Sequence, residues 1–199
     1  MVQDSKGVGI LVANGFSENE YLGIKHRLGD AGIEYNIISP EENEVRSYTS
    51  LKNEIDVDYT VEGLFERIDE YVLKSDPLSY EMVIIPGGSF SSYKLISDDF
   101  SIDFINEIYY NNKILAAISD GTQVISELDD IKGKFVTSPM QYKDDLLKKG
   151  ALWVDNEIAI DKGLITSRNY NDLDIFMNKV VDSLIHTRVL KSYMKKYTV

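Results

Sequence analysis

Residues 114–123 read Ile-Leu-Ala-Ala-Ile-Ser-Asp-Gly-Thr-Gln, and they are the most informative part of the sequence about its fold. Its first five residues are apolar and predict a short buried strand, while residues 122–128 look helical. A strand that turns sharply into a helix through Ser119 and Asp120 has the form of a nucleophile elbow, which points one side chain out of the sheet. Because the chain must turn within one residue, we expect Ser119 in a sparsely populated backbone region and a helix that begins at Asp120 or Gly121.

Short apolar strands alternate with amphipathic helices along the rest of the chain. Strand signals fall at residues 8–12, 35–38, 82–85, 135–137, 152–154, 158–160 and 164–166. Helical signals fall at residues 17–32, 61–73, 101–111, 143–149 and 171–190. The alternation predicts an α/β fold, a parallel-sheet α/β/α sandwich with helices on both faces of the sheet. In such sheets the ligand site lies beyond the carboxyl ends of the strands.

Length and composition fit one domain. The chain has 199 residues, of which 43% are hydrophobic and 27% charged, enough for a sizeable core and a well-solvated surface. We expect a single domain over residues 1–199, with an irregular polar excursion at 41–60 and a basic tail at 191–199 that frays. No apolar run approaches the roughly 20 residues of a membrane span, and residues 1–7 carry no signal-peptide pattern, so we expect a cytoplasmic protein.

Charge and residue counts argue against several function classes. The formal net charge of -12 disfavours nucleic acid and anionic membranes as partners. The chain has no cysteine, which removes disulfides, thiolate metal sites and cysteine catalysis. It has only two histidines, His26 and His186, and they do not form a metal-ligand spacing. No phosphate-loop or dinucleotide fingerprint is present, so we expect neither a metal nor a cofactor.

Two more strand ends carry sharp turns. Residues 13–20 read Ala-Asn-Gly-Phe-Ser-Glu-Asn-Glu, and residues 84–88 read Ile-Ile-Pro-Gly-Gly. Together with the elbow, these turns resemble the ThiJ/PfpI family, which includes intracellular protease I and the Parkinsonism-associated deglycase. The resemblance runs from Val8 to about Leu184. It implies a flavodoxin-like, class I glutamine-amidotransferase-like sandwich, and it implies self-association, because the family's members are dimers or larger.

The resemblance also assigns roles to particular positions. Glu20 matches the family glutamate that hydrogen-bonds the nucleophile, and the backbone amides of Gly88 and Asp120 match its oxyanion donors. The family's elbow reads Ala-Ile-Cys-His-Gly, so Ser119 stands in place of the cysteine and Asp120 in place of the histidine. The protease-like branch has a glutamate soon after the Pro-Gly-Gly turn, whereas residues 89–92 here contain no acid.

These substitutions leave three hypotheses open. The first is a non-catalytic or repurposed family member, a stress-related protein or one that binds a small molecule in the elbow pocket. The second is a hydrolase or a lyase that uses Ser119, Glu20 and Asp120. The third is the family's peptidase or deglycase activity, which the missing thiol makes the least favoured. A serine hydroxyl needs an adjacent base, and an ordinary carboxylate with a pKa of about 4 is a weak one.

The elbow and the turn after the first strand predict a specific arrangement of side chains. The Ser119 hydroxyl should lie within hydrogen-bonding reach of the Glu20 carboxyl and share a pocket with the Gly88 amide. If burial raises the pKa of Glu20, this residue could donate a proton to Ser119 or to a ligand. Asp120 should face solvent or a neighbouring subunit. For self-association, the apolar surface should come from Tyr109, Tyr110 and the helix face from Ile24 to Leu28.

Overall fold

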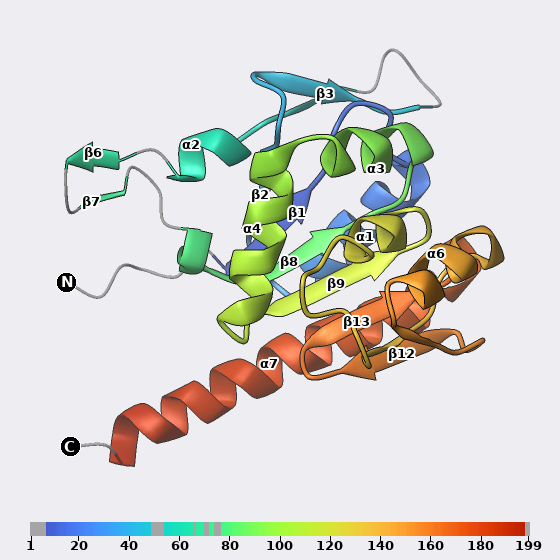
Figure 1. Ribbon diagram of the computed structural model, residues 1–199. Coiled ribbons are helices and arrows are strands. Elements are labelled where there is room, and N and C mark those ends of the chain that lie inside the picture. The colour runs from blue at the N-terminus through green and yellow to red at the C-terminus, as the bar shows by residue number, and fades with distance from the viewer. Residues whose placement is uncertain (1–6, 49–53, 66, 70–71, 74–76, 198–199) are drawn as a thin grey trace.

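A seven-stranded sheet forms the centre of the computed structural model (Figure 1), which describes residues 7–48, 54–65, 67–69, 72–73 and 77–197. The strand order is β12-β13-β9-β8-β1-β2-β5. The strands are β1 (Gly7–Leu11), β2 (Tyr35–Ser39), β5 (Tyr59–Thr60), β8 (Tyr80–Ile85), β9 (Ile114–Ile118), β12 (Ile158–Asp161) and β13 (Leu164–Ser167). Neighbouring strands are parallel except for β12, which pairs antiparallel with β13.

Seven α-helices surround this sheet in the described part of the chain. They are α1 (Glu18–Asp30), α2 (Val61–Phe65), α3 (Ser89–Ile96), α4 (Asp99–Tyr110), α5 (Gly121–Ile125), α6 (Lys143–Lys148) and α7 (Leu173–Tyr197). Three short ribbons complete the described strands: β3 (Glu44–Arg46) with β4 (Glu54–Asp56), β6 (Arg67–Asp69) with β7 (Val72–Leu73), and β10 (Phe135–Val136) with β11 (Leu152–Trp153). None of the described helices is long and apolar enough to cross a bilayer.

The core lies in two layers because alternate residues of each strand point to opposite faces of the sheet. On β9, Leu115 and Ala117 pack with residues of α2, α4 and α5, whereas Ala116 and Ile118 pack with residues of α1 and α7. Both faces are covered, so the strand reads as one apolar run with every residue buried. The α/β/α sandwich that the alternation predicted is confirmed.

Several element boundaries differ from the sequence expectation. The helix expected at 61–73 was wrong beyond Phe65, where α2 ends and the β6–β7 ribbon follows. Five apolar residues at helical spacing did not outweigh Gly63, a poor helix former, and the β-branched Ile68 and Val72. At the other end of the chain, α7 continues to Tyr197, through most of the tail that we expected to fray.

Helix α3 was not predicted at all, because serines occupy much of its buried side. Ser91 and Ser92 are buried beside Leu95, so the apolar periodicity that marks a helix is missing from this segment. The excursion at 41–60 does contain short strands, in β3, β4 and β5.

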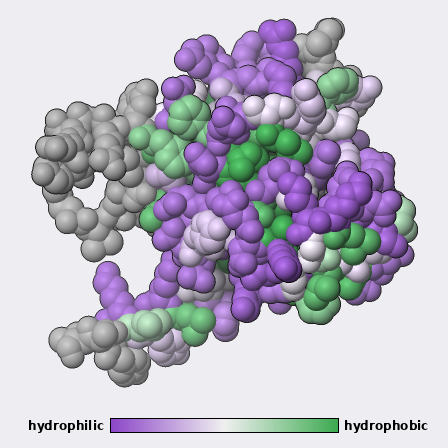
Figure 2. All heavy atoms as spheres, in the orientation of Figure 1, coloured by the Kyte–Doolittle hydropathy of each residue, from purple (hydrophilic) through white to green (hydrophobic). Residues whose placement is uncertain are grey.

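The surface proposed for self-association needs correction. Ile24 and Leu28 are fully buried and Tyr109 is 8% exposed, so these side chains belong to the core. Tyr110 remains exposed, and exposed apolar side chains also occur on α7, including Val189 and Leu190. Most of the surface in Figure 2 is hydrophilic, with hydrophobic residues in small separate groups. Self-association itself stays a prediction.

The last turns of α7 are fixed to the sheet by a buried carboxylate. Glu81 of β8 accepts hydrogen bonds from Arg188 Nε at 2.7 Å and from Lys191 Nζ at 3.1 Å. Although burial opposes ionisation, the two cations lower the pKa of Glu81 below its ordinary value. The Glu81 side chain is 9% exposed, so its negative charge depends on these two partners.

We predict that Arg188→Gln lowers the free energy of unfolding by about 1–2 kcal/mol, because it removes a charge-assisted hydrogen bond from a buried carboxylate. The expected loss of unfolding free energy is small because Arg188 is itself half exposed, and solvent weakens its interaction with Glu81. Urea unfolding at pH 7 is the measurement, and Lys195→Gln, an exposed position further along α7, is the matched control. Equal stabilities for the two variants would contradict the assigned role of Glu81.

Candidate functional site

The elbow between β9 and α5 is a strained turn centred on Ser119. Its φ angle is 57°, in the left-handed region that non-glycine residues seldom adopt, as the sequence predicted. The Ser119 N–H donates to Ser167 O at 3.1 Å, and Ser119 O accepts from the Thr122 N–H and hydroxyl at 3.0 and 2.6 Å. These bonds on both sides of the residue hold the backbone in this conformation.

A glycine is required directly after the elbow. A Cβ atom at Gly121 would lie 2.4 Å from Ile85 O and 2.7 Å from Pro86 O. The start of α5 therefore packs against the end of β8 without space for a side chain. This close approach brings the elbow beside the Pro86-Gly87-Gly88 turn.

The Pro-Gly-Gly turn also contacts the turn that follows β1. Gly88 has a φ angle of 113°, and a Cβ atom there would lie 2.4 Å from Gly15 O and 2.7 Å from Ser17 N. The Ser17 N–H donates to Gly87 O at 2.8 Å. All three strand-end turns singled out in the sequence therefore meet at the carboxyl edge of the sheet, where a parallel sheet places its ligand site.

Glu20, in the first turn of α1, reaches into this junction. Its carboxylate oxygen Oε2 accepts a hydrogen bond from the Gly87 N–H at 2.6 Å. A Cβ atom at Gly87 would lie 2.5 Å from that oxygen and 3.1 Å from Ser119 Oγ, so only glycine leaves room for the acid and the serine together. Ser119 lies close enough to favour the ionised form of the Glu20 carboxyl, and the hydrogen bond expected between these two side chains stays a prediction.

Burial dominates the electrostatics of Glu20. The residue is 3% exposed, and loss of hydration raises the pKa of its carboxyl to about 7. Hydrogen bonds from Gly87 and Ser119 act in the opposite direction, and the nearby charge of Asp120 raises the pKa further. Near neutral pH, Glu20 is thus present both as a proton donor and as an acceptor.

Asp120 does not have the orientation that we expected. Its Oδ2 accepts from the Gly88 N–H at 3.1 Å, and its Oδ1 accepts from the Tyr142 hydroxyl at 2.7 Å and from Gln141 Nε2 at 3.4 Å. Its side chain is therefore half-buried and bonded within its own chain and does not simply face solvent, while the expected contact with a neighbouring subunit stays a prediction. The reason is that the short 3-10 turn Met140–Tyr142 supplies two donors opposite a backbone amide that itself needs an acceptor.

This contact changes the chemistry that the site offers. The Gly88 amide, which the resemblance assigns to the oxyanion, is already bonded to a carboxylate of the same chain. Burial, and then the hydrogen bond to Asp120, raise the pKa of Tyr142 to about 12, so the tyrosine stays a neutral donor. A negative charge that develops on a substrate would be repelled by the Asp120 carboxylate, which occupies the Gly88 N–H.

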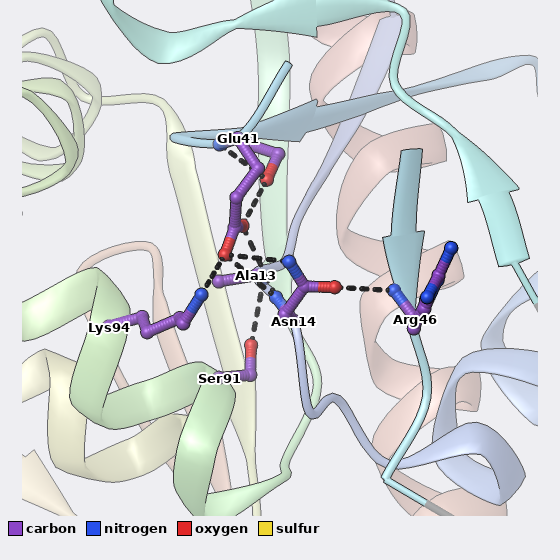
Figure 3. Close-up of polar contacts among 7 residues, drawn as sticks. Ala13, Asn14, Glu41, Arg46, Ser91 and Lys94 are labelled. Carbon is purple, nitrogen blue, oxygen red and sulfur yellow. Dashed lines mark hydrogen bonds and ion pairs between the residues drawn. The ribbon is translucent and has the colours of Figure 1, made fainter. Parts of the chain in front are cut away.

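A second network holds the turn after β1 in place (Figure 3). Glu41 accepts from the backbone N–H and the side-chain amide of Asn14, at 3.2 and 3.1 Å, and forms an ion pair with Lys94 of α3. Ser91 of α3 accepts from the Ala13 N–H at 2.8 Å. Sequence reasoning missed these residues, because Glu41 lies in the irregular excursion and the two others lie on the unpredicted helix.

Other polar groups and cavities are less suited to chemistry. In the residues that the structure describes, no group of three acidic, histidine or cysteine side chains could hold a metal ion. His26 is exposed, and its Nδ1 lies 3.2 Å from Asp30 Oδ2. A groove of about 700 Å³ lies along α7 at the amino ends of β9 and β13, on the opposite edge of the sheet from Ser119. Its lining combines apolar side chains such as Ile114 and Ile165 with the polar Lys179, Asp182 and His186, and it includes none of the three strand-end turns.

Comparison with known proteins places this geometry in a family. Residues 6–183 match the model of the DJ-1/PfpI family. An uncharacterized protein of Staphylococcus aureus (strain Mu50 / ATCC 700699) is 32% identical over 183 residues, which cover 90% of this chain and 99% of that protein. A Bacillus subtilis (strain 168) protein named "Putative cysteine protease YraA" is 28% identical over 180 residues, with the same coverage of 90% and 99%.

Solved structures show the same fold. A two-domain protein from Anabaena variabilis, with DJ-1/ThiJ/PfpI-like and ferritin-like domains, superposes with a TM-score of 0.79 and 27% identity. That match covers 90% of this chain and 50% of the other, so this chain spans about half the length of the two-domain protein. Schizosaccharomyces pombe DJ-1 superposes with a TM-score of 0.76 at 19% identity, covering 97% and 99% of the two chains.

We predict that Glu20 lowers stability as the pH rises. Its folded-state pKa of about 7 lies above the ordinary 4.5, so the folded protein binds this proton more tightly than the unfolded chain does. The resulting stabilisation is complete below pH 4.5 and is lost as the pH rises through about 7. Relative to Glu20→Gln, the wild type should lose roughly 2–4 kcal/mol of unfolding free energy between pH 4.5 and pH 8.

Urea unfolding of the two proteins across this pH range gives the difference directly, and other titrating groups cancel from it. Glu18→Gln, in the same turn of α1 but half-buried, is the matched control. A difference between wild type and Glu20→Gln that does not change with pH would show that Glu20 ionises normally.

Proposed function

The chain belongs to the DJ-1/PfpI family, and we propose that in this member the elbow binds a small molecule without forming a covalent bond to it. The observation that carries the proposal is the hydrogen bond from the Gly88 N–H to the Asp120 carboxylate. A nucleophilic mechanism needs free donors aimed at the charge that develops on the substrate. Here one such donor is satisfied by an acid of the chain itself.

The residue at the elbow supports the same proposal. A thiol has a pKa of about 8.5 and can be ionised by a favourable environment, whereas a serine hydroxyl requires an adjacent base. The Glu20 carboxyl lies beside Ser119, where a base would be needed, and the chain contains no cysteine to serve as an alternative nucleophile. The cysteine protease activity in the name of the Bacillus subtilis relative therefore does not transfer to this chain.

The site suits a ligand that can both donate and accept hydrogen bonds. Ser119 can donate or accept, and Glu20 can do both because its pKa is close to 7. Asp120 contributes a partly exposed acceptor at the rim. A small polar molecule with hydroxyl or carbonyl groups would find partners for each of them.

One observation favours a second candidate, a hydrolase or lyase that uses Ser119. A carboxylate with a pKa of about 7 is a stronger base than an ordinary one, and the Glu20 carboxyl and the Ser119 hydroxyl both lie against Gly87. Glu20 and Asp120 would then act as base and acid on a substrate held at the elbow. This candidate requires Asp120 to leave the Gly88 amide so that an oxyanion can bind there.

We predict that a fluorophosphonate probe does not label the wild-type protein, because Ser119 lacks an effective base and Gly88 is not free to stabilise the adduct. Intact-mass spectrometry after incubation is the measurement. Likewise, methylglyoxal turnover should not exceed that of Ser119→Ala. Labelling that disappears in Ser119→Ala would support the hydrolase and exclude the non-covalent binding site.

A single-thiol control shows whether reagents reach the elbow. Because the chain has no cysteine, Ser119→Cys introduces its only thiol. That variant should be alkylated by iodoacetamide, with Ser192→Cys at an exposed position of α7 as the reference for an open site. Alkylation of Ser119→Cys together with an unlabelled wild type locates the deficiency in the hydroxyl and not in access.

A further inference from the structure

We propose that the Gly88 N–H, the Tyr142 hydroxyl and the Gln141 side-chain amide together form a binding site for a carboxylate group. In the free protein Asp120 fills this site, and the carboxylate of a ligand takes its place when the Asp120 side chain turns outward. The proposal rests on the non-covalent role of the elbow proposed above, and it adds the chemical class of the ligand: a small molecule that bears a carboxylate.

The donors address both oxygens of the carboxylate. The Gly88 N–H donates to Oδ2 at 3.1 Å, while the Tyr142 hydroxyl and Gln141 Nε2 donate to Oδ1 at 2.7 and 3.4 Å. Two segments distant in sequence, the Pro-Gly-Gly turn and the Met140–Tyr142 turn, supply these groups. Donors that converge from separate segments on the two oxygens of one carboxylate are what a carboxylate-binding site requires.

The present occupant is held in a way that permits exchange. Asp120 lies before α5 but makes no side-chain capping bond to it, and it is only half-buried. Among the ion pairs of the described residues, none involves Asp120. Neutral donors alone retain it, so a ligand carboxylate can replace it with the same charge and the same hydrogen bonds.

Asp120 competes with a ligand carboxylate for the same donors, and because Asp120 is part of the chain this competition weakens ligand binding. An acid that is part of the protein competes at a high effective concentration, on the order of millimolar or above. The wild type should therefore bind simple carboxylates weakly, and removal of the Asp120 side chain should strengthen their binding. Glu20 does not compete in the same way, because its carboxylate is bonded to the neighbouring Gly87 N–H, deeper in the junction.

Acetate titration of backbone amide resonances tests the proposal on the whole chain. Asp120→Ala should bind acetate at least tenfold more tightly than the wild type, with the largest shifts at Gly88 and Tyr142. Asp120→Asn is the matched control: it removes the same charge but leaves a side chain of the same size in place, so it should bind acetate as weakly as the wild type. Adding Tyr142→Phe to Asp120→Ala should weaken binding about fivefold, the effect of one lost hydrogen bond.

Two results would overturn the proposal. One is acetate binding to folded Asp120→Ala that is no tighter than to the wild type, with Asp120→Ser as the substitute if the alanine variant does not fold. The other is an equal gain in Asp120→Asn, which would show that removal of a charge explains the effect. Neither result touches the proposed function, which has its own test in the labelling of wild-type Ser119 by a fluorophosphonate.

Discussion

The two consecutive backbone amides of Gly87 and Gly88 are the point on which this site depends. Each donates to a carboxyl group from a different segment: Gly87 to Glu20 of α1, and Gly88 to Asp120 of the elbow. Neither position leaves space for a Cβ atom. The turn after β1, the Pro-Gly-Gly turn and the elbow are thus held together by a contact that only glycines permit, and the chemistry of the site follows from the two acids that this contact brings close.

The two acids differ because their surroundings differ. Glu20 is buried and keeps its proton to about neutral pH, whereas Asp120 is half-buried and accepts from three neutral donors. A site with one partly protonated acid and one acid at the rim can both donate hydrogen bonds to a ligand and accept them from it. It is poorly suited to generating an alkoxide at Ser119, which needs a strong base and a free oxyanion donor.

Much of this arrangement could be predicted from sequence, for physical reasons. The apolar strands, the glycines after β8 and β9 and the strained Ser119 each follow from local rules, and the resemblance located Glu20. The orientation of Asp120 could not be predicted, because it depends on Tyr142, a residue 22 positions away in a short 3-10 turn. Helix α3 was missed because its buried side carries serines, one of which holds the Ala13 N–H.

The two hydrogen bonds from Gly87 and Gly88 can be tested by recording the amide proton resonances of both residues in wild type, Glu20→Gln and Asp120→Ala. The Gly87 amide should shift with pH about a midpoint near 7, and Glu20→Gln should abolish this titration. In Asp120→Ala the Gly88 amide should move upfield, as expected when a hydrogen bond to a carboxylate is lost. A Gly88 resonance that stays in place in Asp120→Ala would show that the Gly88 N–H is not bonded to Asp120. It would contradict the conclusion that an acid of this chain occupies the donor that an oxyanion would need.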